Sequence, residues 1–278
     1  MKILFISDFG LHHTIGGAQR SNDLIIRDGV SRGHNISVYN YDNDPIVFRD
    51  KFDIIISSNL HAITSRINNI VEWLHQQPNH VRLEHDLCPY LNSEGIKWLW
   101  SNCKISFFLT DYHHQLFLDA HGDHYPNVKI VPDPIDRIFF DKGLKRSDEI
   151  LACGFMHPLK GTERFIEYAS QNPDKRFLYA GWGQYEEQMK LIPNINFVGQ
   201  IEHSRMPEIL NHVGSFYHVP IGHEPFCRAV GEAIACGVPN LIIGDNIGAM
   251  HHKTKVGSAF EESCYNATTT FWEHIECL

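Results

Sequence analysis

The chain contains no apolar run long enough to cross a lipid bilayer. Its longest apolar stretches, such as residues 54–56 and 105–109, fall far short of the roughly 20 residues that a spanning helix needs. Asp8 interrupts the apolar run at residues 2–7 before a signal-peptide core could form, and no small-residue cleavage site follows. We therefore expect a first buried strand there, no transmembrane segment, and a cytoplasmic protein.

The chain also lacks paired cysteine motifs. Its seven cysteines are an odd number, are widely scattered and form no CxxC pair, which favours reduced thiols over a disulfide framework. Histidine pairs stand at residues 12–13, 113–114 and 251–252, but adjacent residues rarely share one ion, and no H-x3-H spacing or cysteine partner accompanies them. We expect no metal site.

Basic residues are in the minority. The 24 Lys and Arg face 33 Asp and Glu, a net charge of −9, and acidic residues outnumber basic ones in both halves of the chain. Proteins that bind duplex nucleic acid neutralise its phosphates with clustered Lys and Arg. The charge balance therefore disfavours a nucleic-acid partner, although a local basic groove would be compatible with it.

Short apolar runs alternate with amphipathic segments along the whole chain. Residues 2–7, 35–41 and 52–57 are typical of strands, and residues 18–32 of a helix. After a turn-rich stretch near residues 140–148 the alternation restarts. Its expected strands and helices are 150–153, 161–171, 176–180, 195–198, 204–210, 215–219, 228–236 and 240–243.

This rhythm predicts an α/β fold made of two Rossmann-like domains that face each other across a cleft. We place the domains at residues 1–145 and 146–278, with a terminal helix over 268–278 that returns to the first domain. Ligands of parallel sheets bind where strands end, so the cleft is the expected active site.

One segment carries the strongest chemical signal. In residues 223–239, HEPFCRAVGEAIACGVP, Glu224 and Glu232 are separated by seven residues, and Gly237 suits the end of the helix that contains the second glutamate. The start of that helix offers unpaired N–H groups to a diphosphate, from Phe226 through Cys227 to Arg228. A carboxylate accepts hydrogen bonds from vicinal hydroxyls, which suits a ribose or a hexose.

This segment resembles the E-x7-E motif and following A-x-A-C-G-x-P of retaining GT-B glycosyltransferases of glycosyltransferase family 4. The resemblance extends over most of residues 150–250 and implies the GT-B architecture. It implies that Glu224 contacts the donor sugar, that Glu232 holds the nucleotide ribose, and that the Phe226 and Cys227 backbone, with Arg228, holds the phosphates.

The family's G-R-x4-K-G loop reads GFMHPLKG at residues 154–161. Gly154 and Lys160 match, and the resemblance implies that Lys160 neutralises the leaving diphosphate. Phe155 stands where the family has Arg, which leaves less positive charge for the leaving group. We expect a nearby cation, His157 or Arg228, to compensate, or else reduced activity or a different donor.

Three features of the first half also resemble the family. Gly16 and Gly17 follow the first strand, where they let the backbone approach a ligand. His85, in the sequence EHD, matches a family histidine that contacts the donor sugar near the scissile bond. Asp133, in PDPID, replaces the Asn of a segment that enters the linker, for which we expect an architectural role.

The resemblance implies transfer of a sugar from a UDP- or GDP-linked donor to a carbohydrate, lipid-linked or other hydroxyl acceptor, with retention at the anomeric carbon. The nucleotide sugar is a co-substrate, and we expect no cofactor and no essential metal. Three alternatives keep the fold. They are transfer to a modified DNA base, as in some viral enzymes; a non-catalytic nucleotide- or partner-binding protein; and an oligomeric sugar-phosphate isomerase.

Overall fold

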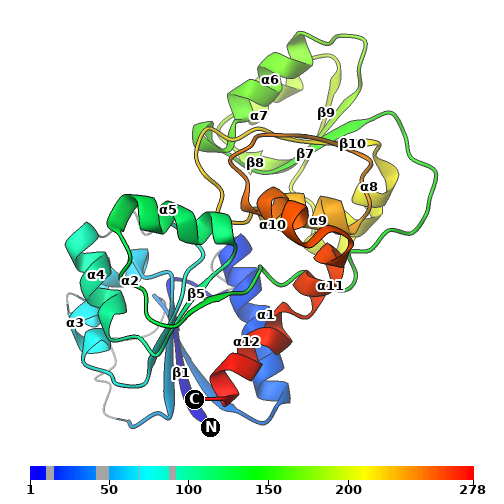
Figure 1. The fold of residues 1–278 in the computed structure, drawn as a ribbon. Helices are drawn as coiled ribbons and strands as arrows, with labels where there is room; N and C mark the ends of the chain where they lie inside the picture. The colour runs from blue at the N-terminus through cyan, green and yellow to red at the C-terminus, as the bar shows by residue number, and fades with distance from the viewer. Residues whose placement is uncertain (11–15, 42–49, 68, 88–91) are drawn as a thin grey trace. The chain divides into compact units, whose positions relative to one another are not determined.

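The computed structural model describes residues 1–10, 16–41, 50–67, 69–87 and 92–278 (Figure 1). The chain divides into two units that each pack mainly within themselves. The first unit combines Met1–Pro134 with Glu262–Leu278, and the second is Ile135–Glu261. The boundary that the sequence suggests, after residue 145, lies within the second unit.

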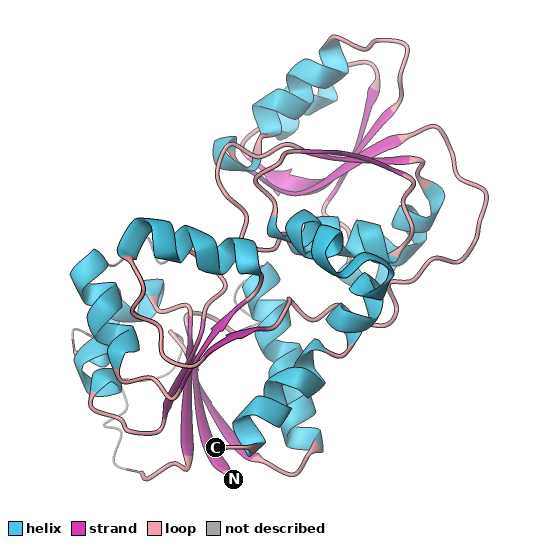
Figure 2. Ribbon diagram, in the orientation of Figure 1, coloured by secondary structure: helices cyan, strands magenta, loops and turns pink. Residues whose placement is uncertain are grey.

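The first unit is a six-stranded parallel sheet with helices on its faces (Figure 2). Its strands lie in the order β2-β1-β3-β4-β5-β6. They are β1 (Lys2–Ser7), β2 (Asn35–Tyr39), β3 (Ile54–Ser58), β4 (His80–Leu83), β5 (Ile105–Phe108) and β6 (Val128–Ile130). The helices are α1 (Gly17–Ser31), α2 (His61–Arg66), α3 (Ile70–His75), α4 (Ser93–Ser101), α5 (Asp111–His121) and α12 (Ala267–Glu276).

Alternation along the strands creates a hydrophobic core on each face of this sheet. Leu4 and Ile6 of β1 pack into one cluster with Trp100, whereas Ile3 and Phe5 pack into the other with Trp272. Successive strand side chains point to opposite faces, so a strand that is apolar throughout must be covered on both sides. The apolar run at residues 2–7 is therefore the innermost part of the first unit.

The last helix, α12, packs beside α1 (Figure 1). Trp272 is fully buried, and its indole N–H donates to the Ile25 carbonyl oxygen at 2.8 Å. Gly29 allows this close approach, because a Cβ there would lie 2.2 Å from the Trp272 ring. The carboxyl-terminal segment thus supplies part of the core of the first unit.

The second unit is a five-stranded parallel sheet in the order β11-β10-β7-β8-β9. Its strands are β7 (Ile150–Met156), β8 (Phe177–Gly183), β9 (Ile195–Gly199), β10 (Ser215–His218) and β11 (Asn240–Ile243). Its helical elements are η1 (Pro158–Lys160), α6 (Thr162–Ser170), α7 (Glu186–Lys190), η2 (His203–Arg205), α8 (Met206–His212), α9 (Arg228–Ala235), α10 (Gly248–Val256) and η3 (Gly257–Ala259). Helix α11 (Phe260–Tyr265) spans the boundary between the units.

The strand order places a topological switch point between β7 and β10. From β7 the chain runs outward through β8 and β9, then returns to the other side of β7 to form β10 and β11. Loops that leave neighbouring strands in opposite directions open a crevice at the carboxyl edge of the sheet, which is where ligands of such sheets bind. None of the helices in the described residues is long and apolar enough to span a membrane.

Candidate functional site

Two charged residues meet at the switch point of the second unit. Lys160, which ends η1 after β7, places its ammonium nitrogen 2.7 Å from Oε1 of Glu224, which follows β10. The lysine side chain is half exposed, whereas that of Glu224 is nearly buried. The structure therefore brings together two of the predicted site residues from opposite sides of the switch point.

A glycine allows the two loops to approach. Gly161 has φ of +76°, and a Cβ there would lie 2.0 Å from the Val219 carbonyl oxygen. The Ile221 N–H donates to the Leu159 carbonyl oxygen at 2.9 Å, which joins the loop after β7 to the loop after β10. Only glycine fits both this backbone conformation and this contact, so Gly161 fixes where Lys160 stands.

Glu224 is held by its backbone and kept ionised by its neighbours. Its N–H donates to the Asn246 carbonyl oxygen at 2.9 Å, and its own carbonyl accepts from Gly248 at 2.8 Å. Burial alone would raise the pKa of its carboxyl group, but hydrogen bonding to His218 and the charge of Lys160 outweigh burial and lower the pKa to about 2. Glu224 is therefore an anion that accepts hydrogen bonds at any physiological pH.

Helix α9 begins at Arg228, four residues after this glutamate. Its N-cap, Cys227, adopts a left-handed backbone conformation with φ of +72°, which is uncommon for a residue other than glycine. Phe226 is buried and lies close against Gly231, one turn into the helix. The turn aims the first N–H groups of α9 at the carboxyl edge, where a helix start favours an anion such as a phosphate.

Glu232 lies within α9 and is held through one of its oxygens. His203 Nε2 lies 2.7 Å from Oε1, and Arg228 Nη2 lies 3.3 Å from the same atom. All three side chains are largely buried. The carboxylate predicted to hold the ribose is thus preoriented, and the side chain of Arg228, a residue predicted at the phosphates, contacts it.

Phe155 belongs to an aromatic group at the end of β7. It is 49% exposed, stacks on His157 with ring centroids 6.1 Å apart, and lies 5.9 Å from the Trp182 ring on β8. His157 Nδ1 accepts from the Leu159 N–H at 3.2 Å, so this candidate cation is engaged in the Lys160 loop. Gly154, just before Phe155, has φ of +116° within the strand.

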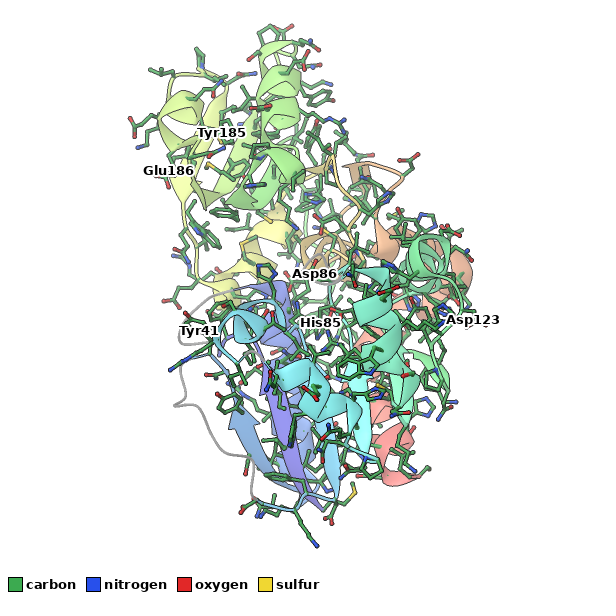
Figure 3. The ribbon with its side chains drawn as sticks, turned by 90° about the vertical axis from the view of Figure 1, so that its left-hand side faces the viewer. Tyr41, His85, Asp86, Asp123, Tyr185 and Glu186 are labelled. Atoms are coloured by element: carbon green, nitrogen blue, oxygen red, sulfur yellow. The ribbon has the colours of Figure 1, made fainter. Side chains whose placement is uncertain are left out.

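In the first unit, His85 follows β4 and is almost completely enclosed (Figure 3). Its Nε2 lies 2.9 Å from Asn22 Oδ1, and its Nδ1 lies 3.2 Å from Asp133 Oδ1. Ser58 donates to the same Asn22 oxygen at 3.2 Å. The contact with Asn22 therefore orients His85 through Nε2, and the Asp133 carboxyl group lies beside its Nδ1.

Sequence reasoning missed the pair that supports His85. Arg82 and Glu84 are fully buried and form an ion pair, and Glu84 Oε1 accepts the backbone N–H groups of His85 and Asp86. The guanidinium group also lies 5.1 Å from the centre of the Trp100 ring. The two opposite charges at residues 82 and 84, within the short sequence VRLE, were the available signal, since burial of such residues requires pairing.

The other predicted residues occupy simpler positions. Gly16 is the N-cap of α1 and Gly17 its first residue, directly after the loop that follows β1. His113 is buried, its Nε2 lies 2.9 Å from the Asp86 carbonyl oxygen, and burial lowers its pKa to about 4. The pair at residues 12–13 and Cys88 lie outside the described residues.

One cluster in the second unit has the composition of a metal site. A ring nitrogen of His218, an oxygen of Glu224 and the sulfur of Cys227 all lie within 4.8 Å of one another. Burial would lower the pKa of His218, but Cys227 and Glu224 outweigh it and raise the pKa to about 10. The sequence interpretation considered only the histidine pairs and missed this group, although its members lie within ten residues of one another.

Comparisons with known proteins agree with this architecture. Residues 134–252 match the family model described as Glycosyl transferases group 1. A search of curated proteins found no match. Among solved structures, HepE from Anabaena in complex with UDP and glucose is similar with a TM-score of 0.70 and 15% identity over 100% of both chains.

Two further structures share the fold. Sucrose-phosphate synthase from Thermosynechococcus elongatus gives a TM-score of 0.69 and 13% identity over 100% of this chain and 96% of that one. An α-glucosyltransferase in complex with UDP and a 13-mer DNA containing an HMU base gives a TM-score of 0.61. Its identity is 16% over 99% of this chain and 90% of that one. The predicted fold class is thereby confirmed: the chain has the α/β GT-B fold of these structures.

Proposed function

We propose that the protein transfers a sugar from a nucleotide diphosphate sugar to an acceptor hydroxyl, with retention of the anomeric configuration. The observation that carries this proposal is the Lys160–Glu224 pair, which lies in the segment just before α9, together with Glu232 within that helix. The match of residues 134–252 to the glycosyl transferases group 1 model supports it, as does the resemblance to family 4.

The donor is assigned to the second unit. His203 and Arg228 both contact Oε1 of Glu232, and we assign the ribose hydroxyls to Oε2. The start of α9 takes the diphosphate, and Glu224 accepts hydrogen bonds from the sugar. Lys160 is half exposed and carries a flexible side chain, so its ammonium can turn from Glu224 to the phosphates when the donor binds.

In the proposed reaction the bond between the anomeric carbon and the phosphate oxygen breaks while the acceptor oxygen bonds to the same face of that carbon. The acceptor proton passes to the departing phosphate oxygen, so no protein base is needed. Lys160 and the α9 amides stabilise the negative charge that develops on the leaving nucleoside diphosphate. We propose that this chemistry requires no metal, and that His85 contacts the sugar from the first unit.

UDP is the first donor nucleotide to test, because the HepE and α-glucosyltransferase structures are complexes with UDP. Thermal unfolding should be measured with UDP, GDP, ADP and TDP. A nucleotide present at 100 times its Kd adds about 2.7 kcal/mol to the free energy of unfolding. Donor hydrolysis and transfer are then assayed with sugars linked to the base that stabilises the protein.

Variants separate the site from the rest of the surface. Glu232→Ala and Lys160→Met should each weaken nucleotide binding roughly tenfold or more, since a hydrogen bond to a charged group contributes about 1.5–3 kcal/mol. Glu187→Ala and Lys190→Met, which remove an exposed surface pair, are the matched controls. Unchanged affinity in Glu232→Ala would refute the ribose role, and an inverted product would refute retention.

Two alternative functions have specific support. Phe155 in place of a cation favours a non-catalytic binding protein, which binding without hydrolysis of any donor would indicate. The likeness to an α-glucosyltransferase bound to DNA favours a modified DNA base as acceptor. The net charge of −9 opposes it, and transfer to a carbohydrate but not to DNA would decide against it.

A further inference from the structure

The His218–Glu224–Cys227 cluster combines an imidazole, a carboxylate and a thiol. His218 and Glu224 are each 9% exposed, and Cys227 is half-buried. His218 Nε2 is buried and lies 3.6 Å from Glu224 Oε1. Nitrogen, sulfur and carboxylate oxygen are the ligand atoms that Zn²⁺ takes in proteins, and three protein ligands with one open position are typical of an accessible zinc site.

We propose that this cluster binds Zn²⁺ and that the bound ion excludes the nucleotide-sugar donor. Binding of the ion depends only on the three side chains. The exclusion of the donor rests on the proposed function, in which Glu224 holds the donor sugar and the Cys227 backbone faces the diphosphate. The ion would block turnover rather than support it.

The distances suit zinc with little movement. A tetrahedral Zn²⁺ holds its ligand atoms roughly 3.3–3.8 Å apart, given bonds of about 2.0–2.3 Å. His218 Nε2 and Glu224 Oε1 are already 3.6 Å apart. Since all three ligand atoms lie within 4.8 Å of one another, the thiol of Cys227 needs to move by about 1 Å at most.

The backbone holds the three ligands in place. The His218 carbonyl oxygen accepts from Gly244 at 3.1 Å, and Glu224 bridges to the segment before α10 through Asn246 and Gly248. Cys227 is fixed in its left-handed conformation at the start of α9. Three ligands on a braced loop lose little freedom when the ion binds, which raises affinity.

Lys160 supplies the competing positive charge. Its ammonium lies 2.7 Å from the Glu224 oxygen that also faces His218. Zn²⁺ at this position would balance the carboxylate and a thiolate, and would repel the ammonium toward solvent, where the half-exposed side chain can extend. Removal of the Lys160 charge should therefore strengthen metal binding, while the same substitution weakens nucleotide binding.

Co²⁺ is a spectroscopic substitute for Zn²⁺ that tests the cluster without an activity assay. The reduced full-length protein is titrated with Co²⁺, and the thiolate-to-cobalt charge-transfer absorbance and the tetrahedral d–d bands are recorded. Zn²⁺ should then displace Co²⁺ and remove both signals. Cys227→Ser should abolish the charge-transfer band, and His218→Gln should weaken binding by at least the roughly 10–100-fold typical of substitutions in the supporting shell.

Matched control variants remove a thiol and an imidazole outside the cluster. Cys277→Ser removes an exposed thiol and His212→Gln an exposed imidazole, and both should bind Co²⁺ as the wild type does. Thermal unfolding checks that every variant folds. Lys160→Met should bind Co²⁺ more tightly than the wild type, so the test does not depend only on variants that lose metal binding.

A charge-transfer band that persists in Cys227→Ser, or wild-type protein that binds no Co²⁺ at 100 μM, would overturn the metal site. UDP should raise the apparent Kd for Zn²⁺ in proportion to its concentration. If UDP and Zn²⁺ bind independently, the exclusion of the donor is wrong while the metal site stands. If no nucleotide binds at all, the proposed function fails and the cobalt titration still decides the metal site.

Discussion

Asp8 shows how one buried carboxylate positions the loops of the first unit. It follows β1 and accepts the backbone N–H groups of His61, Ala62 and Ile63 at 2.8–3.2 Å, at the start of α2. Burial raises the pKa of Asp8 from 3.8 to about 6, although those three hydrogen bonds lower it. The carboxylate therefore joins the end of β1 to the helix after β3, on either side of the switch point of that sheet.

This raised pKa predicts a pH dependence of stability. The folded state binds the Asp8 proton more tightly than the unfolded state, so its contribution to the free energy of unfolding is full below about pH 4. The contribution falls by about 2–3 kcal/mol as the pH rises through the folded-state pKa of about 6 and becomes constant above about pH 7. Asp8→Asn should remove this slope in urea unfolding measured between pH 4 and pH 7.

Asp119→Asn removes an exposed carboxylate from α5 and is the control. It should keep the wild-type slope. An Asp8→Asn protein whose stability follows the same pH curve as the wild type would show that Asp8 titrates normally in the folded protein.

The sequence identified residues by motif and missed those that act through burial. Glu224, Lys160 and Glu232 stand at recognisable spacings, so the resemblance located them, and the structure brings the first two within 2.7 Å. Arg82 and Glu84 have no such spacing. Their pairing follows from the packing of β4 between β3 and β5, which buries both side chains.

At the scale of elements, the expected strands agree closely with the observed ones. The apolar runs at residues 150–153 and 215–219 correspond to β7 and β10, and both lie where a parallel sheet buries its strands on two faces. The short helices α2 and α3 were not predicted individually, because six-residue helices hold too few turns for a clear period. The position of α12 against α1 depends on Gly29, whose role no periodicity reveals.

Gly29 provides a test in which helix propensity and packing predict opposite changes in the free energy of unfolding. Ala stabilises the middle of a helix by about 0.8–1 kcal/mol relative to Gly. A Cβ at residue 29, however, would lie 2.2 Å from the Trp272 ring and 2.7 Å from Ile36, and overpacking typically costs about 1–3 kcal/mol. We expect Gly29→Ala to lower the free energy of unfolding, as measured by urea denaturation.

Val30→Ala, at the exposed next position of α1, is the control and should change stability by less than about 0.5 kcal/mol. A Gly29→Ala protein that is more stable than the wild type would mean that α12 does not pack closely on α1.

At the scale of the whole molecule, alternating strands and helices were enough to predict two parallel β/α sheets. Parallel strands need helical crossovers of one hand, so the order of elements along the chain limits the topology to few choices. The sequence did not indicate that β10 returns beside β7, and this return puts Glu224 next to Lys160. The arrangement of the proposed donor site therefore follows from topology as much as from motif.

The overall charge bears on the class of acceptor in the proposed reaction. A net charge of −9 repels a polyanion, and binding without sequence preference needs clustered Lys and Arg at the phosphates. We expect the protein to bind a labelled 13-mer duplex more weakly than about 10⁻⁴ M at physiological salt, as measured by fluorescence anisotropy. The duplex should be tested with and without an HMU base, because the α-glucosyltransferase that shares this fold was solved with a 13-mer DNA containing that base.

The salt dependence separates the two acceptors. Tight binding that falls by about 10³–10⁵ between 50 and 200 mM salt would reveal 6–10 phosphate contacts, and the DNA acceptor would then replace the carbohydrate or lipid-linked one. Weak binding at both salt concentrations leaves an acceptor that brings no large negative charge. An acidic protein does not repel such an acceptor. The protein would then recognise the hydroxyl groups and ring faces of the acceptor rather than phosphates.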